Sequence, residues 1–334
     1  MHTIIRKELS KQKDILEKAI QGDYSHVCYL EGKHKRYGQY DKNYTNRLRL
    51  AYYILFENVG TEAIIKRLFE EELKDRETNS FQEIGTNLEI LTCLLMQYNE
   101  NNKYEDLFKR AKMANFDCDC GYDKNNKMES DLSKYDIYDC IHIAAEMEYM
   151  DCASVLVNQW KETVTEWNEQ SYSRLISFNK NIKNEVENEE PLKALLKIQM
   201  KKGDNRDIIL AWKDLIHFYI QFDKCEQAYK NFIEMKNKVD RSAFYEIGHL
   251  KFMLEDCMDL ICKYEETAAN QNQEQIQKDI NDLWDWAKPF IKELSDNMHG
   301  NLYKKSIEAA ETVNDQFAEE LLEKYVLWEM RMKL

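Results

Sequence analysis

Glycine and proline are scarce in this chain of 334 residues, which contains nine Gly and two Pro. Average usage of ~7% and ~5% would supply roughly twenty-odd glycines and about seventeen prolines. Sheets with tight turns and loops that cradle phosphate both use glycine, because only Gly adopts a positive φ at little cost. Helices joined by Asn, Asp or Lys turns do not need it. The scarcity of both residues therefore predicts an all-α protein.

Long apolar runs are also missing from the sequence. No stretch approaches the ~18 consecutive apolar residues of a membrane-spanning helix. The N-terminal stretch is charged and amphipathic, without the basic-then-apolar order of a secretory signal. The nine cysteines are odd in number, and most lie in helical apolar patterns, where a free Cys behaves as a core residue. We therefore expect a cytoplasmic protein with reduced cysteines and no membrane partner.

Sequence motifs of common enzymes are absent as well. There is no Gly-rich nucleotide loop, no G-x-x-x-x-G-K-[ST], no G-x-S-x-G and no H-E-x-x-H. The sequence therefore predicts a protein that is not an enzyme and uses no cofactor. An enzyme that uses residues 117–142 stays open as a less favoured alternative.

The same region suggests a metal site only weakly. Cys118 and Cys120, followed by Cys140 and His142, are residue types that bind zinc. However, C-x-C is tighter than the usual spacing, and two residues that lie two apart on a helix face different directions. The acidic loop at 117–129 resembles a calcium loop in composition, but its glycine falls at the wrong offset. We expect no metal, with a zinc protein as the less favoured alternative.

The chain is acidic, with a formal net charge of −14 and a pI near 5.2. Binding of nucleic acid requires a clustered positive field, so this charge disfavours a nucleic-acid partner. A basic protein would be attracted to such a chain. The alternative is that the acidity serves only solubility.

Residues 22–44 stand apart, because they contain three of the nine glycines, five tyrosines and a basic run. This composition predicts an ordered loop or a short hairpin around Glu31 and Gly32. The only strong positive cluster of the chain begins here, and Arg36 and Tyr37 lie within it. Interleaved Arg and Tyr can hold phosphates and stack on bases, or meet an acidic patch of another protein. The alternative is that the cluster pairs with the chain's own carboxylates. Its members are Lys33, Lys35, Arg36, Tyr37, Tyr40, Lys42, Tyr44, Arg47 and Arg49.

The rest of the chain shows apolar residues at helical spacing, interrupted by short polar breaks. Short loops make successive helices antiparallel neighbours. We expect an N-terminal helical region over residues 1–115, which includes the basic Tyr-rich loop 22–44. An array of helical hairpins over 116–334 follows.

One predicted hairpin carries large and small residues in a regular order. These residues are Trp212, Leu215, Tyr219, Ala228 and Phe232. Their order and spacing resemble a tetratricopeptide repeat, in which a small Ala lets two helices approach closely while large side chains fill the space between them. Ile216 departs from the family pattern by replacing a small residue, and Asp240 stands where the closing Pro is expected. The resemblance implies a solenoid of paired helices with an extended surface that binds peptides or proteins.

Two weaker copies of this order occur earlier in the chain. The first comprises Leu91, Leu94, Tyr98, Leu107 and Ala111. The second comprises Ile137, Cys140, Ala144, Ala153 and Val157. The three copies begin 46 and 75 residues apart, whereas regular repeats of this family recur every ~34 residues. The sequence therefore predicts an irregular stack of antiparallel helical hairpins with a tetratricopeptide-like character.

The resemblance also implies which side chains face the binding surface. On the first helices of two copies, these are Tyr138, His142, Glu146, Lys213, His217 and Gln221. Together with Arg36 and Tyr37 they are the candidate partner-binding residues. The alternative for the six helical residues is an ordinary solvated helix face.

These observations favour a non-catalytic helical-repeat module that binds a protein, and the expected partner is basic. The most concrete version is an immunity or antitoxin type of protein that neutralises a basic toxin, because the chain is acidic, helical and without catalytic motifs. The alternative is an intracellular regulator that senses a peptide or a small ligand.

Overall fold

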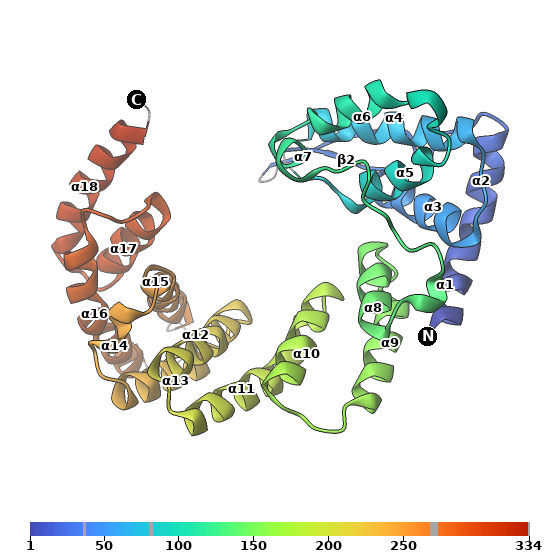
Figure 1. The fold of residues 1–334 in the computed structure, drawn as a ribbon. Helices are drawn as coiled ribbons and strands as arrows, with labels where there is room; N and C mark the ends of the chain where they lie inside the picture. The colour runs from blue at the N-terminus through green and yellow to red at the C-terminus, as the bar shows by residue number, and fades with distance from the viewer. Residues whose placement is uncertain (36–37, 80–82, 268–272, 333–334) are drawn as a thin grey trace. The chain divides into compact units, whose positions relative to one another are not determined.

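A computed structural model describes residues 1–35, 38–79, 83–267 and 273–332 of the chain (Figure 1). These residues form helices that pack in successive antiparallel pairs, together with one hairpin of two short strands. The all-α fold expected from the sequence is confirmed. Within the described part of the chain, no helix is both long enough and apolar enough to cross a membrane.

The chain divides into two compact units. Unit 1 contains residues 1–165 and 180–183, and unit 2 contains residues 166–179 and those from 184 onward. The division expected after residue 115 rested on the character of the sequence and stays a prediction.

Unit 1 contains the first nine helices and both strands. Its elements are α1 (His2–Leu9), α2 (Lys13–Ile20), β1 (Glu31–His34), β2 (Gly38–Asp41), α3 (Tyr44–Glu57), α4 (Glu62–Thr78), α5 (Thr86–Met96), α6 (Glu105–Lys112), α7 (Phe116–Gly121), α8 (Ile137–Glu146) and α9 (Met150–Thr163), with 3₁₀ turns at Ser10–Gln12, Glu100–Asn102 and Leu132–Lys134. Thr61 is the N-cap of α4, and its side chain accepts a hydrogen bond from the Ile64 amide.

Residues 22–44 do contain a hairpin, but Glu31 and Gly32, around which it was expected, lie within strand β1 and not at the turn. Strands β1 and β2 are antiparallel, and Glu31 pairs with Asp41 while Gly32 pairs with Tyr40. A Cβ atom at Gly32 would lie 2.6 Å from the Tyr40 ring. Only glycine therefore allows this ring to lie over the strand.

A buried network of charged side chains joins this hairpin to α3 and α4. Arg47 Nη1 lies 2.7 Å from Asp41 Oδ2, and Arg47 Nη2 donates to Glu72 Oε2 at 2.7 Å. Arg76 Nε lies 3.1 Å from Glu72 Oε1, and Arg76 also pairs with Asp75. Burial raises the pKa of Glu72 and of Asp75, and the two guanidinium groups oppose this effect. Each charge is therefore stabilised mainly by its neighbours in the network.

Unit 2 is built entirely from helices and turns in its described part. Its elements are α11 (Glu189–Lys202), α12 (Asn205–Gln221), α13 (Cys225–Lys238), α14 (Ala243–Glu246), α15 (Leu250–Thr267), α16 (Gln273–Leu294), α17 (Gly300–Thr312) and α18 (Phe317–Met332), with a 3₁₀ turn at Glu185–Asn188, and α10 (Glu169–Asn181) precedes them. One continuous core runs through these helices, from Leu192 to Leu321.

The hairpin with the strongest repeat character is the pair α12–α13. Trp212, Tyr219 and Ala228 are almost fully buried, and Phe232 lies in the same core. Trp212 and Ala228 have no exposed surface, as expected where a small residue lets two helices approach closely. The Asp204 side chain caps α12 by accepting hydrogen bonds from backbone amides of its first turn.

The two weaker copies of the pattern have different outcomes. The copy over residues 137–157 forms the closely packed pair α8–α9, and Cys140 is fully buried in it. In the copy over residues 91–111, α5 packs mainly against α3 and α4, and α6 packs against α4. The prediction that α5 and α6 form a close pair was therefore wrong.

Candidate functional site

Three of the predicted binding residues lie along one face of α12. Lys213, His217 and Gln221 follow one another at four-residue spacing, which places them on one stripe of the helix. The opposite side of α12 buries Trp212 and Tyr219. The His217 side chain is 58% exposed and that of Lys213 is 18% exposed. His217 and Gln221 are thus exposed, as both a binding surface and an ordinary solvated helix face require, and the binding role of these residues stays a prediction.

His217 connects α12 to α15. Its Nδ1 lies 2.7 Å from Asp256 Oδ1, whose side chain is only 9% exposed. The hydrogen bond with Asp256 raises the pKa of His217, and burial opposes the change. The other oxygen of Asp256, Oδ2, is buried and has no hydrogen-bond partner among the described residues.

Two further carboxylates of α15 connect it to α17. Glu255 Oε1 accepts a hydrogen bond from Asn301 Nδ2 at 2.9 Å and lies 3.4 Å from His299 Nε2. Lys305 Nζ donates to Asp259 Oδ2 at 2.6 Å. We call Glu255, Asp256 and Asp259 the acidic row of α15. Together with the residues that contact it from α12 and α17, this row forms the α12–α15–α17 face.

An exposed aromatic ring lies beside the acidic row. Phe252 is 53% exposed, and it precedes the three carboxylates by three, four and seven residues, so it shares their side of α15. Its ring centroid lies 6.0 Å from that of His249 and 6.2 Å from that of His299. An aromatic ring next to carboxylates suits a Lys or Arg side chain, which can stack on the ring and pair with the anions.

The other three predicted residues lie on α8, in unit 1. Glu146 accepts a hydrogen bond from Tyr52 Oη at 3.0 Å and another from Thr86. His142 Nδ1 lies 3.0 Å from Asn181 Nδ2. Tyr138 is half-buried, with its ring 6.2 Å from that of Trp160. The six predicted residues therefore lie three on each unit.

His142 and Glu146 do share an open pocket. The pocket has a volume of about 380 Å³, and Ala145 and Asn181 complete its lining. Glu146 already accepts hydrogen bonds from two hydroxyl groups of unit 1. The pocket therefore presents a carboxylate that neighbouring helices hold in place.

The structure describes only part of the basic cluster that was predicted as a binding site. Arg36 and Tyr37 lie outside the described residues. Arg47 is buried in the charged network, so it pairs with the chain's own carboxylates, which was the alternative for this cluster. Lys33 Nζ lies 3.5 Å from Glu31 Oε1, and Arg49 Nε donates to the Met147 carbonyl. Lys33, Arg47 and Arg49 therefore all have their partners within unit 1.

The cysteines of the region considered as a zinc site do not form a metal-binding group among the described residues. Cys118 and Cys140 are buried, whereas Cys120 is exposed, and all three are free thiols. Burial raises the pKa of Cys140 to about 12, so that it stays protonated as a core residue does. In the described ranges, no group of three or more His, Cys, Asp or Glu side chains has a geometry that could hold a metal ion.

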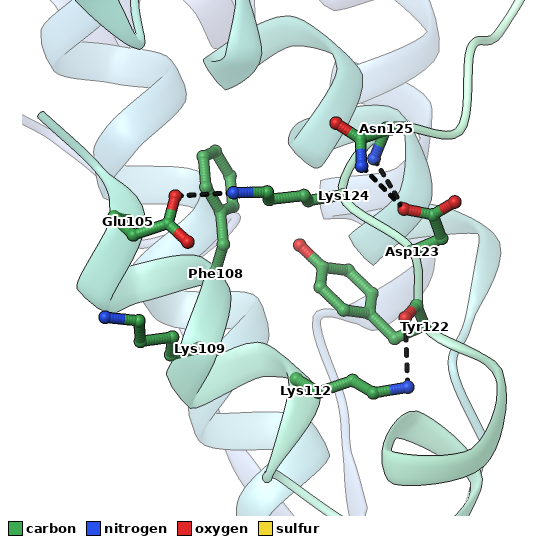
Figure 2. Close-up of a pocket in the computed structure, with 8 residues that line it drawn as sticks. All are labelled: Glu105, Phe108, Lys109, Lys112, Tyr122, Asp123, Lys124 and Asn125. Carbon is green, nitrogen blue, oxygen red and sulfur yellow. Dashed lines mark hydrogen bonds and ion pairs between the residues drawn. The ribbon is translucent and has the colours of Figure 1, made fainter. Parts of the chain in front are cut away.

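Sequence reasoning missed a lysine-lined pocket between α6 and the loop after α7 (Figure 2). It has a volume of about 230 Å³. Lys124 Nζ donates to Glu105 Oε2 at 2.6 Å, and Lys112 Nζ donates to the Tyr122 carbonyl at 3.2 Å. Burial raises the pKa of Tyr122 to about 12. The lining residues are Glu105, Phe108, Lys109, Lys112, Tyr122, Asp123, Lys124 and Asn125.

Comparison of the chain with protein-family models, with curated proteins and with solved structures finds no match.

Proposed function

We propose that this chain is a non-catalytic helical-repeat module that binds a basic protein through the α12–α15–α17 face. The observation that carries the proposal is the exposed ring of Phe252 beside the acidic row of α15. Exposed aromatic residues next to anchored charges are typical of the residues that dominate binding energy in protein interfaces. The carboxylates are held by neighbouring helices, so little side-chain freedom is lost when a partner binds.

The order of helix contacts supports a tetratricopeptide-like array in unit 2. Helix α12 packs against α15, and α15 packs against α17. Each of these three helices also packs against the helix that follows it as its hairpin partner: α13, α16 and α18 respectively. In a helical-repeat array the first helices of successive hairpins stack side by side in this way and form an extended binding surface.

The distribution of charge supports a basic partner. Residues 251–334 contain 18 Asp and Glu but only 10 Lys and Arg, so this quarter of the chain contributes a net charge of −8 of the total of −14. The acidic row lies within this segment. A concentrated negative field accelerates the encounter with a basic protein and disfavours acidic competitors.

The most specific form of the proposal is an immunity-type protein that neutralises a basic toxin. Such a protein needs a surface whose charge is complementary to that of the toxin, and it needs no catalytic group of its own. An acidic helical array whose charged side chains make structural contacts agrees with both conditions.

The test begins with affinity purification of the tagged chain from its native cells, followed by titration of the recovered partner against purified variants. Phe252→Ala and Asp259→Asn remove the ring and one carboxylate of the face. We expect each to weaken binding at least tenfold, whereas Tyr245→Ala, which removes another exposed aromatic of unit 2, changes it less than twofold. Equal binding by all variants would refute the face, and the absence of any protein partner would refute the function.

A second function, the sensing of a small anionic ligand, is favoured by the lysine-lined pocket of unit 1 (Figure 2). Phosphate or citrate bound there would raise the melting temperature, because a ligand that binds only the folded state stabilises it. Lys109→Ala should abolish the increase, and Lys13→Ala on α2 should leave it intact. A melting temperature that neither ligand changes would rule out this function for these ligands.

A further inference from the structure

Helix α18 has apolar side chains on two sides. Phe317 and Leu321 are buried in the core of unit 2. On another side, Leu322, Val326 and Met330 are 50%, 42% and 59% exposed. Their four-residue spacing places them in one row along the helix. We call these three residues the α18 stripe.

The α18 stripe extends over two turns, or about 12 Å at 1.5 Å per residue. Leu327 and Met332 are also exposed on this helix, outside the row of the stripe. An exposed apolar row of this kind is typical of a helix face that another element covers.

The position of α18 is fixed from the opposite side. Trp328 lies against the backbone of Gly300, and its ring stacks on that of Tyr325 with 6.0 Å between centroids. Tyr303 lies 6.5 Å from Trp328 by the same measure. The stripe is thus presented by a helix that aromatic packing holds in place.

The rim of the stripe is acidic. Glu319 and Glu323 lie one turn from members of the stripe, and neither side chain has an ion-pair partner among the described residues. Near the other end of the stripe, Glu329 accepts a hydrogen bond from Tyr325. Lys324 is engaged elsewhere, 3.3 Å from Asp296 and 3.5 Å from Glu320.

A second copy of the chain is a less suitable cover for the stripe. It would bring the same glutamates, Glu319, Glu323 and Glu329, to the apolar seam, and like charges beside such a seam are destabilising.

We propose that the α18 stripe binds an amphipathic basic helix, with apolar residues at intervals of three and four and with Lys or Arg beside them. The apolar residues of that helix cover Leu322, Val326 and Met330, and its cations pair with Glu319 and Glu323. The inference deepens the proposed function by assigning an element of the basic partner to a second surface, and it rests on that function for the partner's identity.

The test uses two labelled 18-residue helical peptides with the same leucine pattern, one with lysines beside the leucines and the other with glutamates. Fluorescence anisotropy measures their binding to the full chain. We expect the lysine peptide to bind at least tenfold more tightly than the glutamate peptide. Val326→Asp should weaken it at least tenfold, while Met200→Asp, at an exposed methionine of α11, leaves it unchanged. Circular dichroism checks that both variants keep their helix content.

Other results would overturn the proposal. Equal binding of both peptides would show unspecific apolar contact, and no binding of the lysine peptide would remove the site. Sedimentation that reveals a dimer abolished by Val326→Asp would assign the stripe to a second copy. A chain that binds its basic partner through Phe252 but does not bind the lysine peptide keeps the proposed function and loses only this inference.

Discussion

His217 of α12 and Asp256 of α15 form a hydrogen bond of 2.7 Å between Nδ1 and Oδ1. The histidine is more than half exposed, while the aspartate is almost completely buried. Lys213 and Asp214, on the same helix as His217, also face it and act on its charge in opposite directions. This contact fixes a residue of the predicted binding face against the acidic row of α15.

The pair predicts a pH-dependent contribution to stability. The folded-state pKa of His217 is raised above its ordinary value of 6.5. The stabilisation is therefore complete below pH 6.5, and it is lost as the pH rises through the folded-state pKa. Urea unfolding between pH 6 and 8 should show this loss in the wild type, with an amplitude below about 1 kcal/mol because the pair is partly exposed. His217→Gln should remove that part of the slope, and an unchanged slope would contradict the assignment.

Close packing of α12 on α13 predicts that Ala228→Leu is destabilising. Ala228 is fully buried, and a leucine there overpacks the hairpin at a cost of roughly 1–3 kcal/mol. Gln227→Leu adds the same side chain one position away, where it is exposed, and should change the free energy of unfolding by less than about 0.5 kcal/mol. Denaturant titration of both variants measures the difference, and equal effects would contradict the packing.

The buried network of unit 1 predicts a large effect of Arg47→Met. Arg47 pairs with Asp41 and Glu72 at 2.7 Å, and all three side chains are fully buried. Removing the cation leaves uncompensated carboxylates, which should cost about 3–5 kcal/mol. Arg6→Met removes a surface arginine 3.8 Å from Glu57 and should cost at most about 1 kcal/mol. Thermal and urea unfolding compare the two, and a small effect of Arg47→Met would show that the network is open to water.

The close contact between Gly300 and the Trp328 ring predicts that a side chain at position 300 disturbs the packing of α18. A Cβ atom at this position would lie 2.5 Å from the Trp328 ring. Gly300→Ala should therefore displace the ring and destabilise unit 2 by roughly 1–3 kcal/mol. Gly248→Ala is the control, since its Cβ would have no neighbour within 4 Å. The change in tryptophan fluorescence should occur with Gly300→Ala alone, and its absence would contradict the described packing of α18.

Local features of the fold were predictable because their causes lie within a few residues of sequence. The scarcity of glycine and proline indicated helices. The order of Trp212, Tyr219 and Ala228 predicted a closely packed hairpin, because both helices of the pair are adjacent in the chain. The hairpin predicted over residues 91–111 was wrong because a row of leucines is compatible with any helical core. Helix α6 packs against α4 and not closely against α5.

The candidate site was only partly predictable. The repeat pattern placed His217 on a candidate binding surface, but no pattern pointed to its partner Asp256, which lies 39 residues away in a chain with 61 acidic residues. In the sequence Arg47 belongs to a basic cluster. Its pairing could not be predicted, because its carboxylate partners come from β2 and α4, which only the fold brings together. Nothing in the sequence marks Phe252 as an exposed residue, since its exposure depends on how α15 packs against α17.

Binding of a basic protein to the α12–α15–α17 face can be measured by quantitative mass spectrometry of co-purified proteins. The tagged wild type and a Phe252→Ala/Asp259→Asn double variant are purified from the same native cells. We predict one basic protein in near-equal molar amount with the wild type, reduced at least tenfold with the double variant and retained by Tyr245→Ala. No stoichiometric partner, an acidic partner, or equal recovery by the double variant would contradict the claim.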